Sequence, residues 1–378
     1  MDPALAEPAP HTGGETLIRL CLVGLSVVAT LAVAEAGLRL ARYAPVRYPS
    51  TARLHDRDWT TLLDCYPTNP RGHFDIDLRT PAARERYRHL APKRIDAIAR
   101  RAPYAVEFRY NRLGFREQAP EPKPAGVVRV VMLGDSFTEG QGVRESDTCP
   151  RRLEAALNEA GGRHWQVRNC GRRAKDFPEL SASFEAALQY DPDVVVYAMV
   201  LNDPERSPEF HARQTWVNDW ILDQGRMEMQ GDAPAPTGAL DSRLWAFARD
   251  RWSTFEIGYA STRWYLEMYD TPNRDGWERT KERIRQMDRR MRARGGSFVL
   301  ALWPLLVDLG PVYPFERCHD TIRAFCRTSG IRFDDLRTIL AGRPADSLIV
   351  HAVDRHPNEE ADRLAARELA QVVRSVSR

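Results

Sequence analysis

The chain has 378 residues, 43% of them hydrophobic, so it can bury a sizeable core as one large domain with insertions or as two smaller domains. Its 55 basic and 52 acidic residues are interspersed and leave a formal net charge of only +3, which gives no case for binding of nucleic acid. The six cysteines include no Cys-x-x-Cys pair, so neither a zinc knuckle nor a dithiol redox motif is expected, and a single disulfide stays possible in an oxidising compartment.

An uncharged apolar run lies near the N-terminus, from Leu20 to Ala34. Extended to Leu17–Leu40, it reaches the ~20 residues that a membrane-spanning helix needs. We expect residues 1–44 to contain a single-pass membrane anchor, with the following domain in the periplasm or outside the cell. A cleaved signal peptide is one alternative, because Ala32-Val33-Ala34 fits a small-x-small cleavage site, and a buried helix is another.

The flanking charges leave the orientation of this segment open. Three arginines follow the apolar run, and by the positive-inside rule they favour a cytoplasmic location for the C-terminal side: Arg39, Arg42 and Arg47. Large domains can cross a membrane despite such flanks, so the rule does not decide the orientation.

Residues 45–125 are rich in proline and arginine and have no regular hydrophobic period. We interpret them as an extension packed on the main domain. The stretch YNRLGFREQAPEPKPAG (Tyr110–Gly126) ends in a Pro-rich segment that is typical of a linker leading into the next domain.

Strands and helices alternate from residue 126 to residue 378, which predicts one α/β domain. Apolar strands are predicted at Val127–Leu133, Trp165–Arg168, Asp193–Val200, Ser297–Trp303 and Ser347–Val350, with a weaker one at Ile331–Phe333. Helices are predicted at Thr148–Ala160, Pro178–Gln189, Trp277–Arg294, Phe315–Thr328 and Asn358–Val376. Continuous apolar strands separated by amphipathic helices indicate a parallel sheet with helices on both faces.

A long segment, residues 203–276, interrupts this alternation. It is rich in aromatic residues and is predicted to be a helical insertion that forms a lid or subdomain. Such aromatic side chains serve packing more often than they form a sugar-binding platform, so we expect packing here.

Polar residues gather in four loops of the α/β domain. The carboxyl ends of parallel strands meet at one edge of an open sheet, so these loops are expected to converge. They are Gly134-Asp135-Ser136, Asn169-Cys170-Gly171, Leu201-Asn202-Asp203-Pro204, and the segment from His351 that contains Asp354 and His356. Each loop alone would fit a helix cap or an ordinary turn.

Together the four loops supply the parts that acyl transfer needs. Ser136 is the candidate nucleophile, His356 the candidate base, and Asp354 the acid that orients His356. The Ser136 N–H, the Gly171 N–H and the Asn202 side chain are the candidate donors to an oxyanion.

The same stretches resemble the signature blocks of the SGNH (GDSL-type) esterase and acyltransferase superfamily. The matching blocks are GDSFTEGQGV, NCG, LND and DRHPN, and YNRLGFR is similar to a lead-in found in bacterial, often membrane-anchored, members. The resemblance covers roughly residues 105–376. It implies a flavodoxin-like three-layer α/β/α fold, with Ser136 as nucleophile, Gly171 and Asn202 in the oxyanion hole, His356 as base and Asp354 as its partner.

Three positions depart from the pattern of this superfamily. The acid usually stands three residues before the histidine, whereas Asp354 stands two before His356. A glycine usually stands two residues before the asparagine of the third block, where this chain has Val200. The second block often has a further glycine, where this chain has Ala174. No reacting group is lost.

The sequence therefore predicts a membrane-anchored serine esterase that acts on O-acyl groups, such as acetyl esters of a cell-envelope or exopolysaccharide glycan. An O-acyltransferase that uses the same triad is an alternative, and a non-catalytic binding or scaffold protein on the same fold is another. No cofactor is expected. A metal site at His351, Asp354 and His356 is a weaker interpretation, because no second group of ligands is evident.

Overall fold

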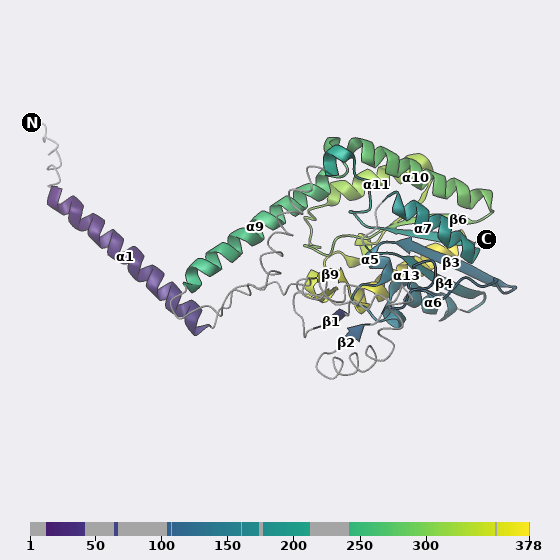
Figure 1. Ribbon diagram of the computed structural model, residues 1–378, viewed down its shortest axis with the longest axis horizontal. Coiled ribbons are helices and arrows are strands. Elements are labelled where there is room, and N and C mark those ends of the chain that lie inside the picture. The colour runs from purple at the N-terminus through teal and green to yellow at the C-terminus, as the bar shows by residue number, and fades with distance from the viewer. Residues whose placement is uncertain are drawn as a thin grey trace, which may run out of the picture. The chain divides into compact units, whose positions relative to one another are not determined.

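The computed structural model describes residues 13–41, 64–66, 104–106, 108–159, 161–173, 177–211, 242–351 and 354–377. The chain divides into two compact units. The helical unit comprises residues 1–47 and 234–259, and the α/β unit comprises residues 48–233 and 260–378. Helix α9 (Arg243–Glu267) begins in the first unit and ends in the second (Figure 1).

The helical unit contains α1 (Gly13–Leu40) and the first part of α9. Helix α1 has a stretch, Thr16–Leu40, whose most apolar window has a mean hydropathy of 2.3 and no residue buried within the structure. By length and composition α1 can therefore cross a membrane, as an anchor or as a signal sequence.

A parallel five-stranded sheet forms the centre of the α/β unit, with the strand order β4-β3-β5-β6-β7. The three central strands coincide with apolar runs of the sequence, as expected for strands buried on both faces. The strands of the sheet are β3 (Val127–Gly134), β4 (His164–Gly171), β5 (Val194–Met199), β6 (Ser297–Leu302) and β7 (Arg332–Asp335).

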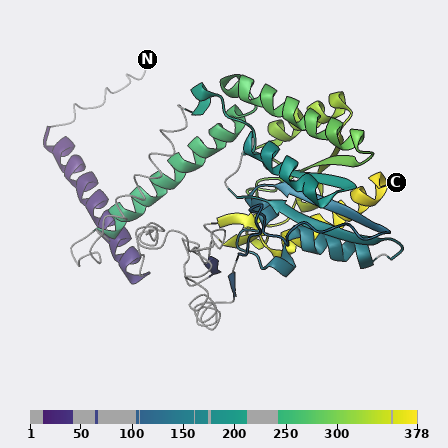
Figure 2. The ribbon, with the colours of Figure 1, turned by 45° about the vertical axis from the view of Figure 1, so that its right-hand side comes forward.

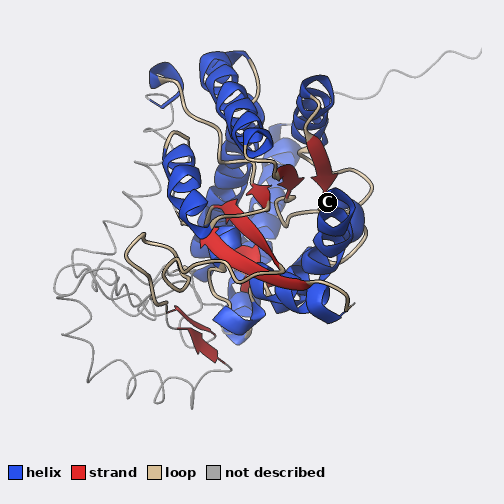
Figure 3. Cartoon of the chain, turned by 90° about the vertical axis from the view of Figure 1, so that its right-hand side faces the viewer, coloured by secondary structure: helices blue, strands red, loops and turns tan. Residues whose placement is uncertain are grey.

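Helices cover both faces of this sheet (Figures 1 and 3). One face carries α6 (Cys149–Glu159) and α13 (Glu359–Val376), which contact each other. The other carries α7 (Glu179–Ala187), α10 (Arg274–Ala293) and α11 (Glu316–Ser329). The predicted three-layer α/β/α fold is confirmed.

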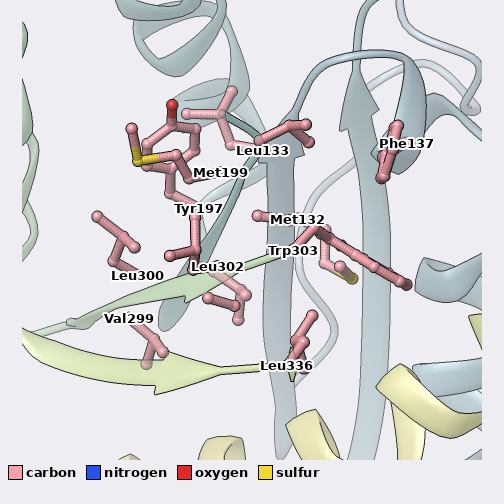
Figure 4. Close-up of a cluster of buried hydrophobic side chains, with 14 of the residues drawn as sticks. Met132, Leu133, Phe137, Tyr197, Met199, Val299, Leu300, Leu302, Trp303 and Leu336 are labelled. Carbon is pink, nitrogen blue, oxygen red and sulfur yellow. The ribbon is translucent and has the colours of Figure 1, made fainter. Parts of the chain in front are cut away.

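The core lies between the sheet and its helices. Figure 4 shows part of it, in which side chains from three adjacent strands and from the loops after them pack together, including those of Met132, Leu133, Tyr197, Met199, Leu300, Leu302 and Trp303. All of these side chains are buried. Packing of this kind fixes the ends of the strands, and with them the loops that follow.

Two predicted strands differ from those observed. Strand β4 does not stop at Arg168 but continues to Gly171, because its parallel register with β3 extends to a pair between Gly134 and Gly171. The predicted strand Ser347–Val350 was expected in the parallel sheet, and this was wrong: β8 (Ile349–His351) pairs antiparallel with β9 (Asp354–Pro357). Only residues 352 and 353 separate β8 from β9, and so short a connection permits only antiparallel pairing.

Several smaller elements complete the described structure. They are the two-stranded antiparallel sheet of β1 (Asp64–Tyr66) and β2 (Tyr104–Val106), the short helices α5 (Ser136–Glu139) and α12 (Arg337–Leu340), and the 3₁₀ turns η1 (Glu145–Asp147), η2 (Leu188–Tyr190), η3 (Thr271–Asn273) and η4 (Ala345–Ser347). Most of the predicted extension 45–125 and residues 212–241 of the predicted insertion lie outside the described residues. Five described cysteines are free thiols, exposed at Cys21 and buried at Cys149, Cys170, Cys318 and Cys326.

Candidate active site

Ser136 is the first residue of α5, directly after the end of β3. The Asp135 side chain caps this helix by accepting a hydrogen bond from the Phe137 N–H at 2.9 Å. The chain is crowded at Gly134, because a Cβ at this position would lie 2.2 Å from Thr138 Oγ1 and 2.7 Å from the Ala198 carbonyl oxygen. Glycine therefore lets β3 pass close to β5 and puts the serine at the edge of the sheet.

His356 comes from β9, far along the chain from Ser136. Its Nε2 atom lies 2.8 Å from Ser136 Oγ, which is hydrogen-bond distance. Two neighbours fix the strand that carries it. The Arg355 guanidinium donates to the Leu306 carbonyl at 3.1 Å, and the Asn358 side chain caps α13 by accepting from the Glu360 and Ala361 N–H groups. The backbone that carries the imidazole is thus fixed on both sides of His356.

An aromatic side chain packs against the imidazole ring of His356. The Phe137 and His356 rings have centroids 5.3 Å apart, and Phe137 in turn meets Trp303 edge to face at 5.8 Å. Trp303 is fully buried and follows the end of β6, where its backbone N–H donates to the Met199 carbonyl. Since α5 carries both Ser136 and Phe137, the same short helix provides the hydroxyl and restricts the ring that faces it.

Asp135 is a buried carboxyl next to the serine. Burial raises its pKa above the ordinary value, and hydrogen bonds from the Phe137 N–H and the Asn202 side chain, together with the charge of a protonated His356, offset part of that rise. Its Oδ2 atom lies 3.5 Å from Ser136 Oγ, at the long limit for a hydrogen bond. The main role that this geometry gives Asp135 is to cap α5 and hold Asn202.

Asn202 lies in the loop after β5, as predicted, and its side chain reaches Asp135 beside the serine. The neighbouring Asp203 fixes this loop: its carboxylate accepts from the Tyr197 hydroxyl at 2.7 Å and from the Val200 N–H at 3.0 Å. The asparagine amide is therefore brought to the same edge of the sheet as Ser136.

Gly171 lies at the end of β4, directly against the nucleophile helix. A Cβ on Gly171 would lie 2.2 Å from the Glu139 backbone nitrogen and 2.6 Å from the Thr138 carbonyl carbon. Its N–H donates to the Asn169 side-chain oxygen at 3.0 Å. Gly171 thus has a clear packing role, and its N–H would have to change partner to serve an oxyanion. Ala174, where relatives often have glycine, lies outside the described residues.

Asp354 lies in β9 with its backbone paired opposite His351. The side chains of both residues fall outside the described part of the structure, so their proposed roles, as orienting acid and as metal ligand, stay predictions. Among the described side chains, no group of three or more His, Cys, Asp or Glu residues is arranged to hold a metal ion.

The residues that hold the far end of α5 were not predicted from the sequence. The Arg116 guanidinium is buried and donates to the carbonyls of Glu139 and Gly140 at 3.2 and 2.8 Å. Glu139 also forms an ion pair with Arg173. Both guanidinium groups stack on the Phe108 ring, with their central carbons 4.0 and 4.2 Å from its centroid. In the sequence, the features that could have indicated these contacts are Arg116 in the stretch GFR and Glu139 in the stretch GDSFTE.

Glu117 holds a second group of contacts that the sequence did not reveal. Its buried carboxylate accepts from Arg151 at 2.8 Å through both oxygens and from the Asn169 N–H at 2.8 Å, with Arg168 at 3.5 Å. The residue thereby ties the GFRE segment to α6 and to the end of β4. Since Asn169 in turn accepts from the Gly171 N–H, Glu117 fixes the backbone that lies against α5.

Comparison with known proteins agrees with this architecture. The model of the GDSL-like lipase/acylhydrolase family matches residues 132–364, well over half of the chain. The chain belongs to this family and is a carboxylic ester hydrolase of the GDSL/SGNH type. No curated protein matches the chain in sequence.

Solved structures that resemble the chain include three of lipolytic or acetylesterase type. A putative lipolytic protein of the G-D-S-L family from Desulfitobacterium hafniense is 15% identical, with a TM-score of 0.36 over 65% of this chain and 99% of that one. A lipase/acylhydrolase from Enterococcus faecalis is 13% identical, with a TM-score of 0.39 over 66% and 96%. A carbohydrate acetylesterase family member from Sinorhizobium meliloti is 14% identical, with a TM-score of 0.33 over 66% and 98%.

Proposed function

We propose that this protein is a serine esterase that hydrolyses O-acyl esters through a covalent acyl-enzyme. The observation that carries the proposal is the 2.8 Å distance between Ser136 Oγ and His356 Nε2. A serine hydroxyl is a weak nucleophile unless an adjacent base takes its proton, and the imidazole is at the distance that proton transfer needs.

In the first half of the proposed reaction, His356 Nε2 accepts the Ser136 proton while Oγ attacks the ester carbonyl carbon. The negative charge that develops on the carbonyl oxygen is stabilised by the Ser136 N–H, which opens α5 and has no carbonyl partner within that helix, and by the Asn202 amide. The intermediate collapses when the alkoxide leaves and takes the proton from His356, and the acyl group stays on Ser136.

In the second half, a water molecule gives its proton to His356 and attacks the acyl carbon. Collapse of the second intermediate releases the carboxylic acid and returns the proton to Ser136 Oγ. Asp354 is proposed to hold the imidazole in the productive tautomer and to stabilise its protonated form. If an acceptor hydroxyl takes the place of water, the same residues transfer the acyl group instead of hydrolysing the ester.

We further propose that the substrate is an O-acetylated glycan of the cell envelope and that α1 is retained as the membrane anchor. The apolar composition of α1, with no residue of its most apolar window buried, supports the anchor. The glycan remains a proposal from the sequence, and a panel of acetylated glycans and of aryl esters with short and long acyl chains tests it directly.

The experiment compares full-length wild type with Ser136→Ala and with Ser146→Ala, a serine that is exposed on η1. Ser136→Ala is expected to reduce kcat by about 10⁴-fold or more and to abolish labelling by a fluorophosphonate, whereas Ser146→Ala retains both. Counting acyl groups passed to added glycan against those passed to water separates hydrolysis from transfer. Labelling and turnover that survive in Ser136→Ala would refute the assignment.

A further inference from the structure

Helix α9 carries four large aromatic side chains that the described structure leaves exposed. Trp245, Trp252, Phe255 and Tyr259 are 63–70% exposed, and we call them the aromatic stripe. With the exposed Ala248 they follow one another at intervals of three or four residues, so they lie on one face of the helix. A continuous exposed apolar face of this kind marks an interaction site.

The aromatic stripe begins beside the C-terminal end of α1, which carries Glu35. Glu35 of α1 accepts hydrogen bonds from the backbone N–H groups of Arg243 and Leu244 at 2.9 and 2.7 Å and from the Ser242 hydroxyl at 3.1 Å. The first N–H groups of a helix have no carbonyl partners inside it, so Glu35 caps α9 from a second helix. Figures 1 and 2 both show α9 starting beside the end of α1.

The position of Glu35 along α1 relates the stripe to a membrane. The apolar stretch Thr16–Leu40 spans 25 residues, about 37 Å of helix, which exceeds the ~30 Å hydrocarbon core. The core takes about 20 helical residues, and about 20 residues counted from Thr16 end at Glu35, so with this part of α1 in the bilayer Glu35 and its ion-pair partner Arg39 reach the headgroup region. The first turn of α9, capped by Glu35, lies at the same depth.

We propose that the aromatic stripe of α9 binds the headgroup interface of the phospholipid bilayer that α1 crosses. Tryptophan and tyrosine are the side chains that favour this interface, because their rings are apolar and their N–H or O–H groups stay hydrated. The exposed Arg251 borders the stripe and its positive charge suits anionic headgroups. A helix that lies on the bilayer in this way attaches the chain to the membrane at a second point, in addition to α1.

A second copy of the chain is the competing occupant, since the spacing of the stripe is also that of a coiled-coil seam. Such seams are built from leucine, isoleucine and valine, whereas this one presents two tryptophans, a phenylalanine and a tyrosine. The side-chain chemistry therefore favours lipid.

The far end of α9 is packed into the α/β unit. The Trp264 ring stacks on Phe210 with centroids 6.4 Å apart, and the Tyr265 ring meets Phe315 at 5.5 Å. Because α9 runs without a break from Arg243 to Glu267, its membrane-bound half continues directly into the unit that carries Ser136. The inferred binding thus tethers the chain that carries the esterase to the bilayer through α9 as well as through α1.

Tryptophan fluorescence of the full chain in nanodiscs with brominated phospholipids tests this inference. Helix α1 contains no tryptophan, so quenching by lipid bromines must come from another part of the chain. We expect the wild type to be quenched and the Trp245→Phe/Trp252→Phe variant to lose at least half of the quenched amplitude. Trp277→Phe, which removes a buried tryptophan of α10, is the control that should keep it.

Equal quenching of the wild type and the Trp245→Phe/Trp252→Phe variant, or no quenching of either, would overturn the inference. If a second copy covers the stripe, nanodiscs contain two chains by mass and the two tryptophans are shielded from the bromines, which is again a refutation. Turnover of a soluble aryl ester is measured in parallel. It reports on the proposed function separately, because none of the three tryptophans lies among the residues proposed for catalysis.

Discussion

His356 Nε2 and Ser136 Oγ lie 2.8 Å apart although 220 residues separate them in the sequence. The two come together because β3 delivers the serine to the edge of the sheet, and the β8–β9 hairpin brings the histidine to the same place. Helix α5 contacts β9 directly, and the Phe137 ring of α5 packs against the His356 ring of β9. The pair is thus a product of the fold and not of a local motif.

The acid of the proposed triad can be identified by substitution. Asp354→Ala is expected to lower kcat by about 10³–10⁴-fold with little change in KM, because the imidazole loses the carboxylate proposed to orient it. Asp346→Ala, at an exposed position on η4, is the matched control. Steady-state kinetics with a soluble aryl ester make the comparison. A kcat that stays at the wild-type value would remove Asp354 from the triad.

Gly171 is expected to tolerate no side chain. In Gly171→Ala the new Cβ would lie 2.2 Å from the Glu139 nitrogen, so β4 or α5 has to shift, at a cost of about 1–3 kcal/mol in the free energy of unfolding. Urea unfolding measures the loss of stability, and activity should fall with it. Gly310→Ala, where the nearest atom would be 3.4 Å away, is the control. A Gly171→Ala protein with wild-type stability and activity would contradict the packing role.

The sequence predicts the fold well where a run of neighbouring residues is enough to determine the secondary structure. The apolar runs Val127–Leu133 and Asp193–Val200 are long and unbroken, and each appears as a central strand of the sheet. The positions of Ser136 and His356 follow from polar residues at the ends of such runs. The end of β4 was placed too early, because its last residues are polar or small and only their pairing with β3 makes them a strand.

The supporting residues could not be predicted from the sequence. Arg116 and Glu117 look like ordinary charged residues before a Pro-rich segment, and their partners are backbone groups that approach only in the folded chain. Gly171 was predicted as an oxyanion donor from its place after a strand. Its closest neighbours belong to α5, which no spacing along the chain could reveal.

Arg116 is expected to act as a positioning residue for the nucleophile. Arg116→Met removes the donors to the Glu139 and Gly140 carbonyls, so the end of α5 loses its fixed place and kcat should fall about tenfold with KM unchanged. The rate of fluorophosphonate labelling of Ser136 should fall in proportion, and Arg116→Lys should recover part of it. Arg112→Lys, at an exposed position, controls for the loss of a guanidinium. Unchanged labelling in a folded Arg116→Met protein would argue against positioning.

Glu117 is expected to be a major determinant of stability. Glu117→Gln leaves the Arg151 and Arg168 guanidinium groups without their buried carboxylate, and removal of one partner from such a group costs about 3–5 kcal/mol. Chemical denaturation at neutral pH gives the change in the free energy of unfolding. Glu121→Gln removes the more exposed carboxylate that also pairs with Arg168 and should cost less than about 1 kcal/mol. Equal losses in the two variants would show that burial of Glu117 is unimportant.

Asp334 in β7 should make stability depend on pH. Burial, together with the nearby Glu368 and Asp335 carboxylates, raises its pKa to about 6. The neutral form is thus favoured in the folded protein, so this group's contribution is fully present below about pH 4 and is lost as the pH rises through 6. Because water reaches the partly exposed side chain, its ionisation lowers the free energy of unfolding by only about 1–2 kcal/mol at pH 8. Asp334→Asn cannot ionise, so it should unfold at a higher temperature than the wild type at pH 8 and at the same temperature at pH 4. Asp346→Asn, an exposed aspartate, is the control. A gain at pH 4 as large as that at pH 8 would show that ionisation of Asp334 is not the cause.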